Sequence, residues 1–282
     1  MNELCVIGYP SRVGGADTEL DHQIHVWQAL GIQVHLIHTG PLDDSLKSLR
    51  MEDRGCIVHE PRNWEACRNK HVISYCNGEF LANLKEIRSV AKTTTFVNCM
   101  CWLFDAEKEA HRQDWIDCFL YQTDHARERV QQDLIAINPQ YRWFKVRPYF
   151  HLADFPYVTQ RGDDRFRFCR ISRDDPAKFH SSQLWVYETM VAPVLKEGVM
   201  LGVNDTIRAK IGQEPNWIRG LPAGACPVQE LYRGAHCLIQ MAETYENLPR
   251  VGFEAMASGC VLIVDDRGGW REEVLHGQTG FL

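Results

Sequence analysis

The strongest constraint on the fold is the alternation of short apolar segments with segments of helical period along all 282 residues. In the first half, apolar runs bounded by turn residues are typical of strands, and residues 16–30 place Leu20, Ile24 and Trp27 on one helical face. This β-α repetition predicts a parallel, doubly wound sheet. We expect strands in this half at 4–9, 32–37, 56–59, 72–75, 93–98 and 118–122, and helices at 16–30, 80–91, 105–114 and 124–137.

The second half repeats this pattern after a stretch rich in Pro, Gly and Asp at 151–164, which is typical of a domain linker. We therefore expect an α/β protein of two Rossmann-like, doubly wound lobes that face a cleft. We expect the first lobe to span residues 1–152 and the second to span residues 153–282. We expect strands here at 165–171, 199–203, 217–221, 237–241 and 261–264, and helices at 178–195, 205–211, 228–234, 248–258 and 269–276.

Composition and charge argue against several classes of protein. A net charge of -6 argues against a basic nucleic-acid or membrane-surface domain. No apolar run approaches the ~20 residues of a membrane span, and the N-terminus is typical of a strand rather than a signal peptide. The eleven cysteines form no C-x-x-C pair, and we interpret the lone C-x-C of Cys99 and Cys101 as structural. These features predict reduced thiols and a cytoplasmic location.

The stretch 243–282 carries the main candidate ligand site. Glu246 and Glu254 stand eight positions apart around a helix start, and Gly268 and Gly269 follow a short apolar strand. A strand end, free helix-start amides and fixed acids suit a phosphorylated, hydroxyl-rich ligand. The alternative for Glu246 is a simple helix cap. Glu254 lies in an apolar helix, where an unpaired carboxylate is costly, so it faces a polar cleft or a basic partner.

Two further loops follow predicted strands. Arg170, Arg173 and Lys178 have the charges to neutralise a diphosphate, and the alternative is surface arginines paired with nearby aspartates. Gly14 and Gly15 allow close approach of the backbone to a ligand, or else form a tight connection with no ligand.

A basic and aromatic strip, YRWFKVRPYF, occupies residues 141–150. Stacking and phosphate neutralisation on a nucleic acid use such residues. The favoured alternative is a strand that enters the linker, with packed aromatic and solvated basic side chains.

The second half resembles the C-terminal signature of retaining GT-B glycosyltransferases, in particular those of family 4. The residues that carry the resemblance are the E-x7-E pair Glu246/Glu254, EAMASG at 254–259, VLIVDD, and GGWREEVLHGQTGFL at 268–282. CRISRDDPAKF at 169–179 resembles the family's G-R-[IL]-S…K loop, and SRVGGADTEL at 11–20 its first glycine loop.

The resemblance implies a GT-B fold and a donor of the UDP- or GDP-sugar type, with no metal and no other cofactor. It implies that residues 1–152 form the acceptor-side lobe and that residues 153–282 form the nucleotide-sugar-binding lobe. It implies that Glu254 holds the ribose hydroxyls and that Glu246 contacts the donor sugar. It further implies that Arg170 or Arg173, with Lys178, binds the diphosphate, assisted by the backbone amides of Asn247 and Leu248. It also implies that Gly14 and Gly15 approach the donor phosphates or the acceptor, and that the nucleobase lies near residues 220–222.

Three departures from the family pattern stand out. Asn247-Leu248-Pro249 replaces the usual Gly-Phe-Gly, and Cys169 replaces the usual Gly before Arg170. The chain also ends at Leu282, where relatives continue through helices that cross back to the first lobe, so we expect a C-terminally truncated member.

The expected reaction transfers a sugar to an acceptor hydroxyl with retention of the anomeric configuration. We expect Glu246, Arg170 and Lys178 to be its catalytic residues. No catalytic base is evident, although His125 is a candidate. Two alternatives stay open: a phage-type transferase that glycosylates a modified DNA base, and a degenerate nucleotide-sugar-binding protein without activity. A homo-oligomer also stays open.

Overall fold

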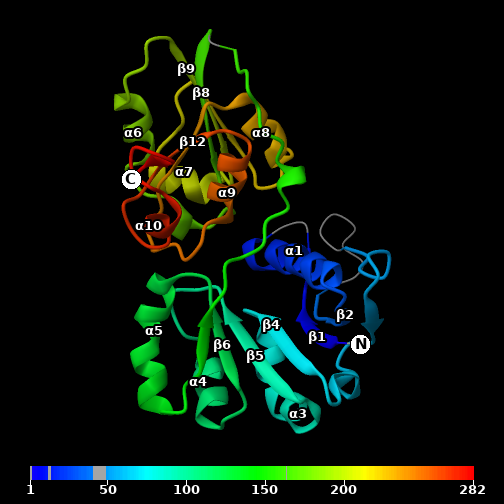
Figure 1. Cartoon of the computed structure of the whole chain (residues 1–282). Coiled ribbons are helices and arrows are strands. Elements are labelled where there is room, and N and C mark those ends of the chain that lie inside the picture. The colour runs from blue at the N-terminus through cyan, green and yellow to red at the C-terminus, as the bar shows by residue number, and fades with distance from the viewer. Residues whose placement is uncertain (1, 12–13, 41–48, 163) are drawn as a thin grey trace. The chain divides into compact units, whose positions relative to one another are not determined.

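The computed structural model describes residues 2–11, 14–40, 49–162 and 164–282. The chain divides into two compact units, Met1–Phe150 and His151–Leu282, each built of strands and helices in alternation (Figure 1). The division lies close to the boundary expected from the sequence.

The first unit contains a seven-stranded parallel sheet in the order β3-β2-β1-β4-β5-β6-β7. The order reverses between β1 and β4, which makes the carboxyl ends of these two strands the topological switch point of the sheet. The strands are β1 (Glu3–Gly8), β2 (Gln33–His38), β3 (Ile57–His59), β4 (His71–Tyr75), β5 (Thr93–Asn98), β6 (Cys118–Tyr121) and β7 (Trp143–Lys145).

Helices cover both faces of this sheet. Helix α1 (Gly15–Ala29) packs Leu20 and Ile24 against one face, and the helices from α2 to α5 cover the other. The helix expected at 80–91 is wrong as a single element, because Asn83 ends one helix and caps the next with a non-helical backbone, φ -111°. The helices on the second face are α2 (Gly78–Ala82), α3 (Leu84–Val90), α4 (Asp105–Arg112) and α5 (Asp124–Ile137).

The second unit contains a six-stranded parallel sheet in the order β10-β9-β8-β11-β12-β13, which reverses between β8 and β11. Helices α6 and α7 pack against one face, and α8 and α9 contact β8, β11 and β12. The elements are β8 (Arg165–Ile171), α6 (Gln183–Thr189), β9 (Leu195–Leu201), α7 (Asp205–Ile211), β10 (Ile218–Leu221), α8 (Val228–Gly234), β11 (Cys237–Gln240), α9 (Arg250–Ala257), β12 (Val261–Val264), α10 (Trp270–Glu273) and β13 (Gly280–Phe281).

The long helix expected at 178–195 is wrong. Lys178 ends a 3₁₀ turn (Pro176–Lys178), and only Gln183–Thr189 is α-helical. Pro193 explains the early end, because it lacks the amide that a helix needs and disfavours helical backbone at the preceding residue. Strand β9 therefore begins at Leu195, paired with Arg165, rather than at residue 199.

Among the described residues, no helix combines the length and apolar character needed to cross a membrane.

Candidate functional site

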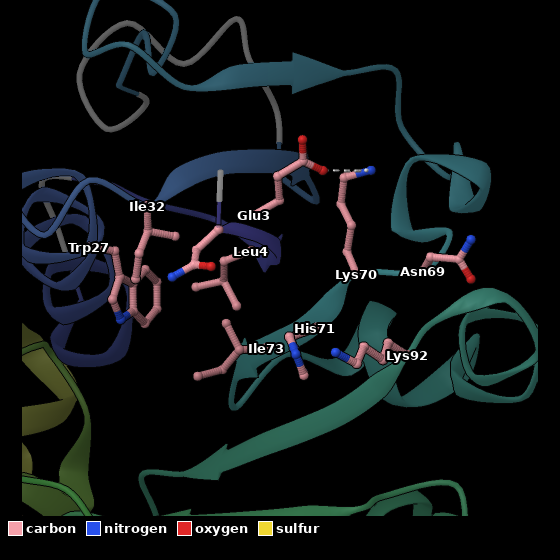
Figure 2. A pocket seen from close by; sticks show the side chains of 10 residues that line it. Glu3, Leu4, Trp27, Ile32, Asn69, Lys70, His71, Ile73 and Lys92 are labelled. Atoms are coloured by element: carbon pink, nitrogen blue, oxygen red, sulfur yellow. Dashed lines mark ion pairs between the residues drawn. The ribbon is translucent and has the colours of Figure 1, made fainter.

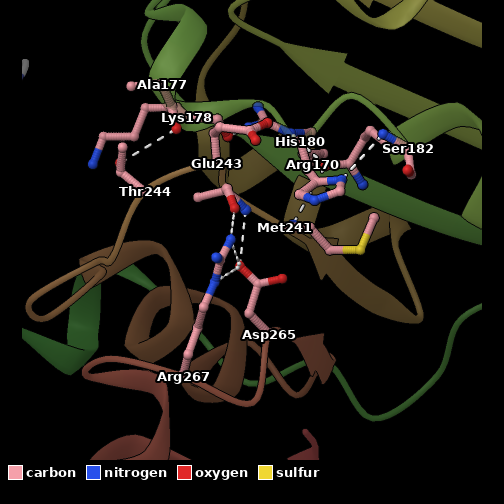
Figure 3. A network of polar contacts seen from close by, with 12 residues as sticks. Arg170, Ala177, Lys178, His180, Ser182, Met241, Glu243, Thr244, Asp265 and Arg267 are labelled. Atoms are coloured by element: carbon pink, nitrogen blue, oxygen red, sulfur yellow. Dashed lines mark hydrogen bonds and ion pairs between the residues drawn. The ribbon is translucent and has the colours of Figure 1, made fainter.

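The switch point of the second sheet brings two loops together. Strands β8 and β11 are parallel neighbours, so the loops that follow them leave from the same edge. Backbone hydrogen bonds join the loops: the Glu243 amide donates to the Ala177 carbonyl at 3.0 Å, and the His180 amide donates to the Met241 carbonyl at 3.4 Å (Figure 3). The arrangement brings residues 172–182 beside residues 241–249.

Lys178 and Glu246 form an ion pair across these loops. The Lys178 Nζ atom lies 2.5 Å from Glu246 Oε2, and the two side chains are 26% and 9% exposed. Lys178 is positioned by the 3₁₀ turn, whose start is capped by the Asp175 carboxylate accepting from the Ala177 amide at 2.9 Å. Two residues that the sequence analysis selected separately therefore meet at the edge where doubly wound sheets bind ligands.

The glycine pair after β12 packs directly against the Glu246 backbone. The Gly269 amide donates to the Glu246 carbonyl at 2.9 Å. A Cβ atom on Gly268 would lie 2.5 Å from the Glu246 carbonyl oxygen, and one on Gly269 would lie 1.3 Å from the Asn247 carbonyl oxygen. Gly268 also has φ +60°, which favours glycine. These glycines therefore fix the backbone that carries Glu246.

Arg170 is fully buried, and its guanidinium donates hydrogen bonds to acceptors of the protein itself. Its guanidinium donates to Gln183 Oε1 at 3.3 Å, to Ser172 Oγ at 2.7 Å and to the Lys178 carbonyl oxygen, and it stacks 3.4 Å above the centre of the Phe179 ring. Burial lowers its pKa to about 10, so Arg170 stays cationic at neutral pH. The side chain holds the loop that presents Lys178.

Arg173 is different, because its side chain is 62% exposed. Its Nη2 atom lies 3.7 Å from Asp175 Oδ2, so the pairing with a nearby aspartate, considered from the sequence, occurs at Asp175. A surface pair of this kind is weak and leaves the guanidinium accessible.

Glu254 lies on α9 and has a hydroxyl partner that the sequence did not reveal. Tyr232, fully buried on α8, donates from its hydroxyl to Glu254 Oε2 at 3.1 Å. Burial raises the pKa of Glu254, and the nearby Arg250 cation and the Tyr232 bond oppose that rise. The residue as a whole is only partly exposed.

The residues before α9 differ from the expected helix start. Pro249 caps the helix, which begins at Arg250, so Asn247 and Leu248 precede it. Both residues are buried, at 6% and 8% exposure, in the segment packed against the glycine pair. Their predicted role as amide donors to a diphosphate stays a prediction.

Asp265 and Arg267 are site-edge residues that the sequence analysis missed. Asp265 Oδ2 accepts from the Ala242 amide at 2.9 Å, and Arg267 donates to the Ala242 carbonyl (Figure 3). These hydrogen bonds hold the backbone of Ala242, at the start of the loop that carries Glu246. Their position directly after the strand at 261–264 is the signal that could have identified them.

In the first unit, Gly14 and Gly15 stand at the start of α1. Gly14 has φ +102° and its carbonyl accepts from Thr18 Oγ1 at 2.8 Å, and a Cβ on Gly15 would meet nothing within 4 Å. Arg12 and Val13 of the same expected glycine loop lie outside the described residues. The approach of this loop to a donor stays a prediction, as does the cleft between the lobes.

The loop after β5 is organised by a buried acid. Glu107 is fully buried and accepts from Asn98 Nδ2 at 3.0 and 3.1 Å and from the Phe104 amide at 3.2 Å. Burial raises its pKa to about 7. His125 is the second residue of α5, and its role as a base stays a prediction.

The basic and aromatic strip is part of the first sheet. Residues Trp143–Lys145 form β7 and pair with β6, Lys145 Nζ lies 2.6 Å from Asp124 Oδ2, and the Arg127 guanidinium stacks 4.4 Å above the Trp143 ring. The side chains of Trp143, Phe144 and Tyr149 are exposed, so the packed alternative holds for only part of the strip, and nucleic-acid binding stays a prediction.

The eleven cysteines are free thiols. Within the described ranges, no group of three or more His, Cys, Asp or Glu side chains is placed to hold a metal ion.

Comparison with known proteins gives a family match for one segment and a fold for the whole chain. Residues 217–282 match the family described as glycosyl transferases group 1, and this segment includes Glu246, Glu254 and the glycine pair. A comparison with curated protein sequences gives no match.

Solved structures resemble the whole chain. Anabaena Alr3699/HepE in complex with UDP and glucose has a TM-score of 0.74 at 13% identity, covering 100% of this chain and 85% of that chain. A glycosyltransferase from Rickettsia africae has a TM-score of 0.76 at 11% identity, covering 99% and 83%. Sucrose-phosphate synthase from Thermosynechococcus elongatus has a TM-score of 0.71 at 13% identity, covering 100% and 85%.

The GT-B fold expected from the sequence is therefore confirmed. The two parallel sheets, together with the group 1 segment at 217–282, support the interpretation of the chain as a glycosyltransferase with this fold.

Proposed function

We propose that this chain is a metal-independent glycosyltransferase that moves a sugar from a nucleoside diphosphate sugar to an acceptor hydroxyl with retention of configuration. The Lys178–Glu246 ion pair carries the proposal, because it combines a phosphate-binding cation and a hydroxyl-binding carboxylate at the edge of the group 1 segment. The complex of Anabaena HepE with UDP and glucose supports a donor of the UDP type, with GDP as the alternative.

The diphosphate is assigned to Lys178 and Arg173. Lys178 supplies a compact charge at the end of a rigid turn, and Arg173 supplies an accessible guanidinium with two parallel donors. A bound diphosphate replaces Glu246 as the counter-ion of Lys178, which frees the carboxylate for the sugar.

The hydroxyl-rich parts of the donor are assigned to the two acids. A carboxylate accepts hydrogen bonds from two vicinal hydroxyls, which suits Glu254 for ribose and Glu246 for the transferred sugar. The raised pKa of Glu254 supports this role, because burial disfavours its charged form and hydrogen bonds from ligand hydroxyls would favour that form.

Arg170 is assigned a positioning role in place of direct contact. Its donors already reach Ser172, Gln183 and the Lys178 carbonyl. It therefore acts on the donor through the loop that presents Lys178.

The proposed chemistry is electrostatic stabilisation of the leaving group. The bond between the anomeric carbon and the diphosphate oxygen breaks through an oxocarbenium-like transition state, and negative charge builds on the diphosphate. Fixed cations at that place are worth a factor of 10²–10³ in rate for each well-placed donor. The acceptor and its base are left open by these contacts.

The test is hydrolysis of UDP-glucose in the absence of an acceptor, followed by proton NMR. We expect glucose to appear first as the α anomer, with an unchanged rate in EDTA. Glu246→Ala and Lys178→Ala should each abolish hydrolysis, whereas Arg233→Ala, on the exposed side of α8, should not. A first-formed β anomer would contradict retention.

A thermal-shift panel separates binding from transfer. We expect UDP or GDP to raise the melting temperature, because a ligand that binds only the folded chain stabilises it. Stabilisation by a nucleotide without any hydrolysis would identify the degenerate binding protein considered from the sequence. No response to any nucleoside diphosphate would contradict the proposed function.

A further inference from the structure

A cavity of about 620 Å³ lies in the first unit at the amino-terminal ends of β1 and β4 (Figure 2). This is the edge of the sheet opposite to the one that doubly wound folds use for their main ligand. The volume falls within the range of ~300–1,000 Å³ that small-molecule sites occupy. The cavity belongs to one unit alone, and nothing in the proposed glycosyl transfer uses it.

Two lysines stand at the same register on neighbouring strands at the cavity rim. The Lys92 amide donates to the Lys70 carbonyl at 2.8 Å, one residue before the pairing of His71 with Thr93. Like charges directly opposite each other across strands destabilise a sheet unless a counter-ion is present. Glu3 supplies one, with its Oε2 atom 3.4 Å from Lys70 Nζ.

Lys92 differs from Lys70 in this respect. Within the described parts of the chain, no carboxylate pairs with its ammonium group, and Figure 2 shows this group directed toward His71 in the cavity. The lining thus holds two lysines and one glutamate, which leaves one uncompensated positive charge.

The other part of the lining is apolar. Trp27, Leu4, Ile32 and Ile73 lie on one side of the cavity in Figure 2, and Lys70, Asn69 and Lys92 lie on the other. Trp27 is only half-buried, although indole is among the most favourable side chains to cover. A flat apolar ring bound on this side would contact the apolar residues, and an anionic group attached to it would face the side that carries Lys92.

Backbone hydrogen bonds hold the walls in place before any ligand binds. The Gln33 amide donates to the Asn2 carbonyl at 2.9 Å, and the Ile32 amide donates to the Trp27 carbonyl at 3.0 Å. On the other wall, the Asn69 amide donates to the Val90 carbonyl at 2.9 Å. A preformed site loses little conformational entropy on binding.

We propose that this cavity is a second binding site, for a small organic monoanion with a flat apolar ring, such as an aromatic carboxylate or sulfonate. The ring lies on Trp27 and the apolar side, and the anionic group pairs with Lys92. A single negative charge matches the single uncompensated cation of the lining.

The test uses 2-naphthalenesulfonate as the probe and its neutral analogue 2-naphthalenesulfonamide as the reference, titrated into the full chain by calorimetry. We expect saturable binding at one site, with the sulfonate tighter. Lys92→Gln should weaken the sulfonate roughly two- to fivefold, the range of an exposed ion pair, and leave the sulfonamide unchanged. Trp27→Leu should weaken both probes by about two- to tenfold, the range of a ring–ring contact.

The matched control is Lys85→Gln, which removes an exposed lysine on α3 outside the cavity lining. Sulfonate affinity that is equal in Lys92→Gln and the wild type, or that falls equally in Lys85→Gln, would overturn the proposal. So would the absence of saturable binding. Lys92 is exposed, so its substitution leaves the fold intact and keeps the test decisive if Trp27→Leu fails to fold.

Discussion

The ammonium group of Lys178 and the carboxylate of Glu246 satisfy each other across two loops, with Nζ and Oε2 2.5 Å apart. The residues are far apart in sequence and meet because β8 and β11 are neighbours at the switch point of the second sheet. In the proposed function, a diphosphate and Glu246 compete for the Lys178 ammonium group, so this ion pair would weaken nucleotide binding.

This competition predicts opposite effects of two neutral substitutions. Glu246→Gln should raise the affinity for UDP roughly two- to fivefold, because Lys178 loses its internal counter-ion. Lys178→Gln should lower that affinity by a similar factor. Calorimetric titration with UDP measures both, and hydrolysis of UDP-glucose should fall by about 100-fold or more in each variant.

Glu243→Gln is the control for this experiment. Glu243 lies on the same loop and pairs with Lys210 at 3.3 Å, away from Lys178. We expect UDP affinity close to that of the wild type. A loss of UDP affinity in Glu246→Gln as large as in Lys178→Gln would show that the two groups do not compete.

The glycine turn predicts a steric effect. Gly269→Ala places a methyl group 1.3 Å from the Asn247 carbonyl oxygen, which forces the backbone of the Glu246 loop to move. We expect the free energy of unfolding to fall by about 3 kcal/mol, with loss of UDP binding. Gly234→Ala is the matched control, since a Cβ there meets nothing within 4 Å. That change should stabilise α8 by about 0.5–1 kcal/mol, and equal melting temperatures of the two variants would contradict the prediction.

The sequence was informative about the fold because the strands are buried on both faces. Apolar runs such as that of β1, whose last four residues are all buried, identified most strands and the parallel class of sheet. It failed where a local signal was weak. The helix expected at 178–195 ignored Pro193, and β13 has only two residues, too few for a period.

Prediction of the site was limited by pairing between distant residues. The sequence selected Lys178 and Glu246 but not their contact, which depends on strand order. It identified Arg170 as a cation for phosphate. The burial of the Arg170 side chain could not be predicted, because a single arginine in an alternating strand is expected on the exposed face. Tyr232 was missed because α8 reads as an ordinary surface helix, and only the packing against α9 brings its hydroxyl to Glu254.

Substitution of Arg170, on β8, and of Arg173, in the loop that follows it, should separate loop positioning from direct contact with the diphosphate. Arg170→Met leaves the Lys178 carbonyl, Ser172 and Gln183 without their donor, so we expect the free energy of unfolding to fall by about 2 kcal/mol, with weaker UDP binding. Arg173→Ala should change stability by less than about 0.5 kcal/mol and weaken UDP roughly two- to fivefold. Urea unfolding and calorimetry measure the two quantities. Reduced UDP affinity in Arg170→Met with unchanged stability would instead indicate that Arg170 contacts the diphosphate.

Glu107 predicts a pH dependence of stability. Burial raises its pKa from the ordinary 4.5 to about 7, so the folded chain holds this proton more tightly than the unfolded chain. The contribution of Glu107 is therefore fully present below about pH 4.5 and is lost as the pH rises through 7. The difference amounts to on the order of 3 kcal/mol.

Glu107→Gln removes this titration while keeping a polar group beside Asn98 and the Phe104 amide. Measured by urea unfolding at pH 5 and pH 8, the variant should gain stability relative to the wild type at the higher pH. Glu109→Gln, on the same helix, is the control: hydrogen bonding by Gln113 lowers the pKa of this exposed acid, so its substitution should not reproduce the gain. A difference between Glu107→Gln and the wild type that stays constant from pH 5 to pH 8 would show that Glu107 is already ionised in the folded chain, and the loop after β5 would then be held by a buried charge.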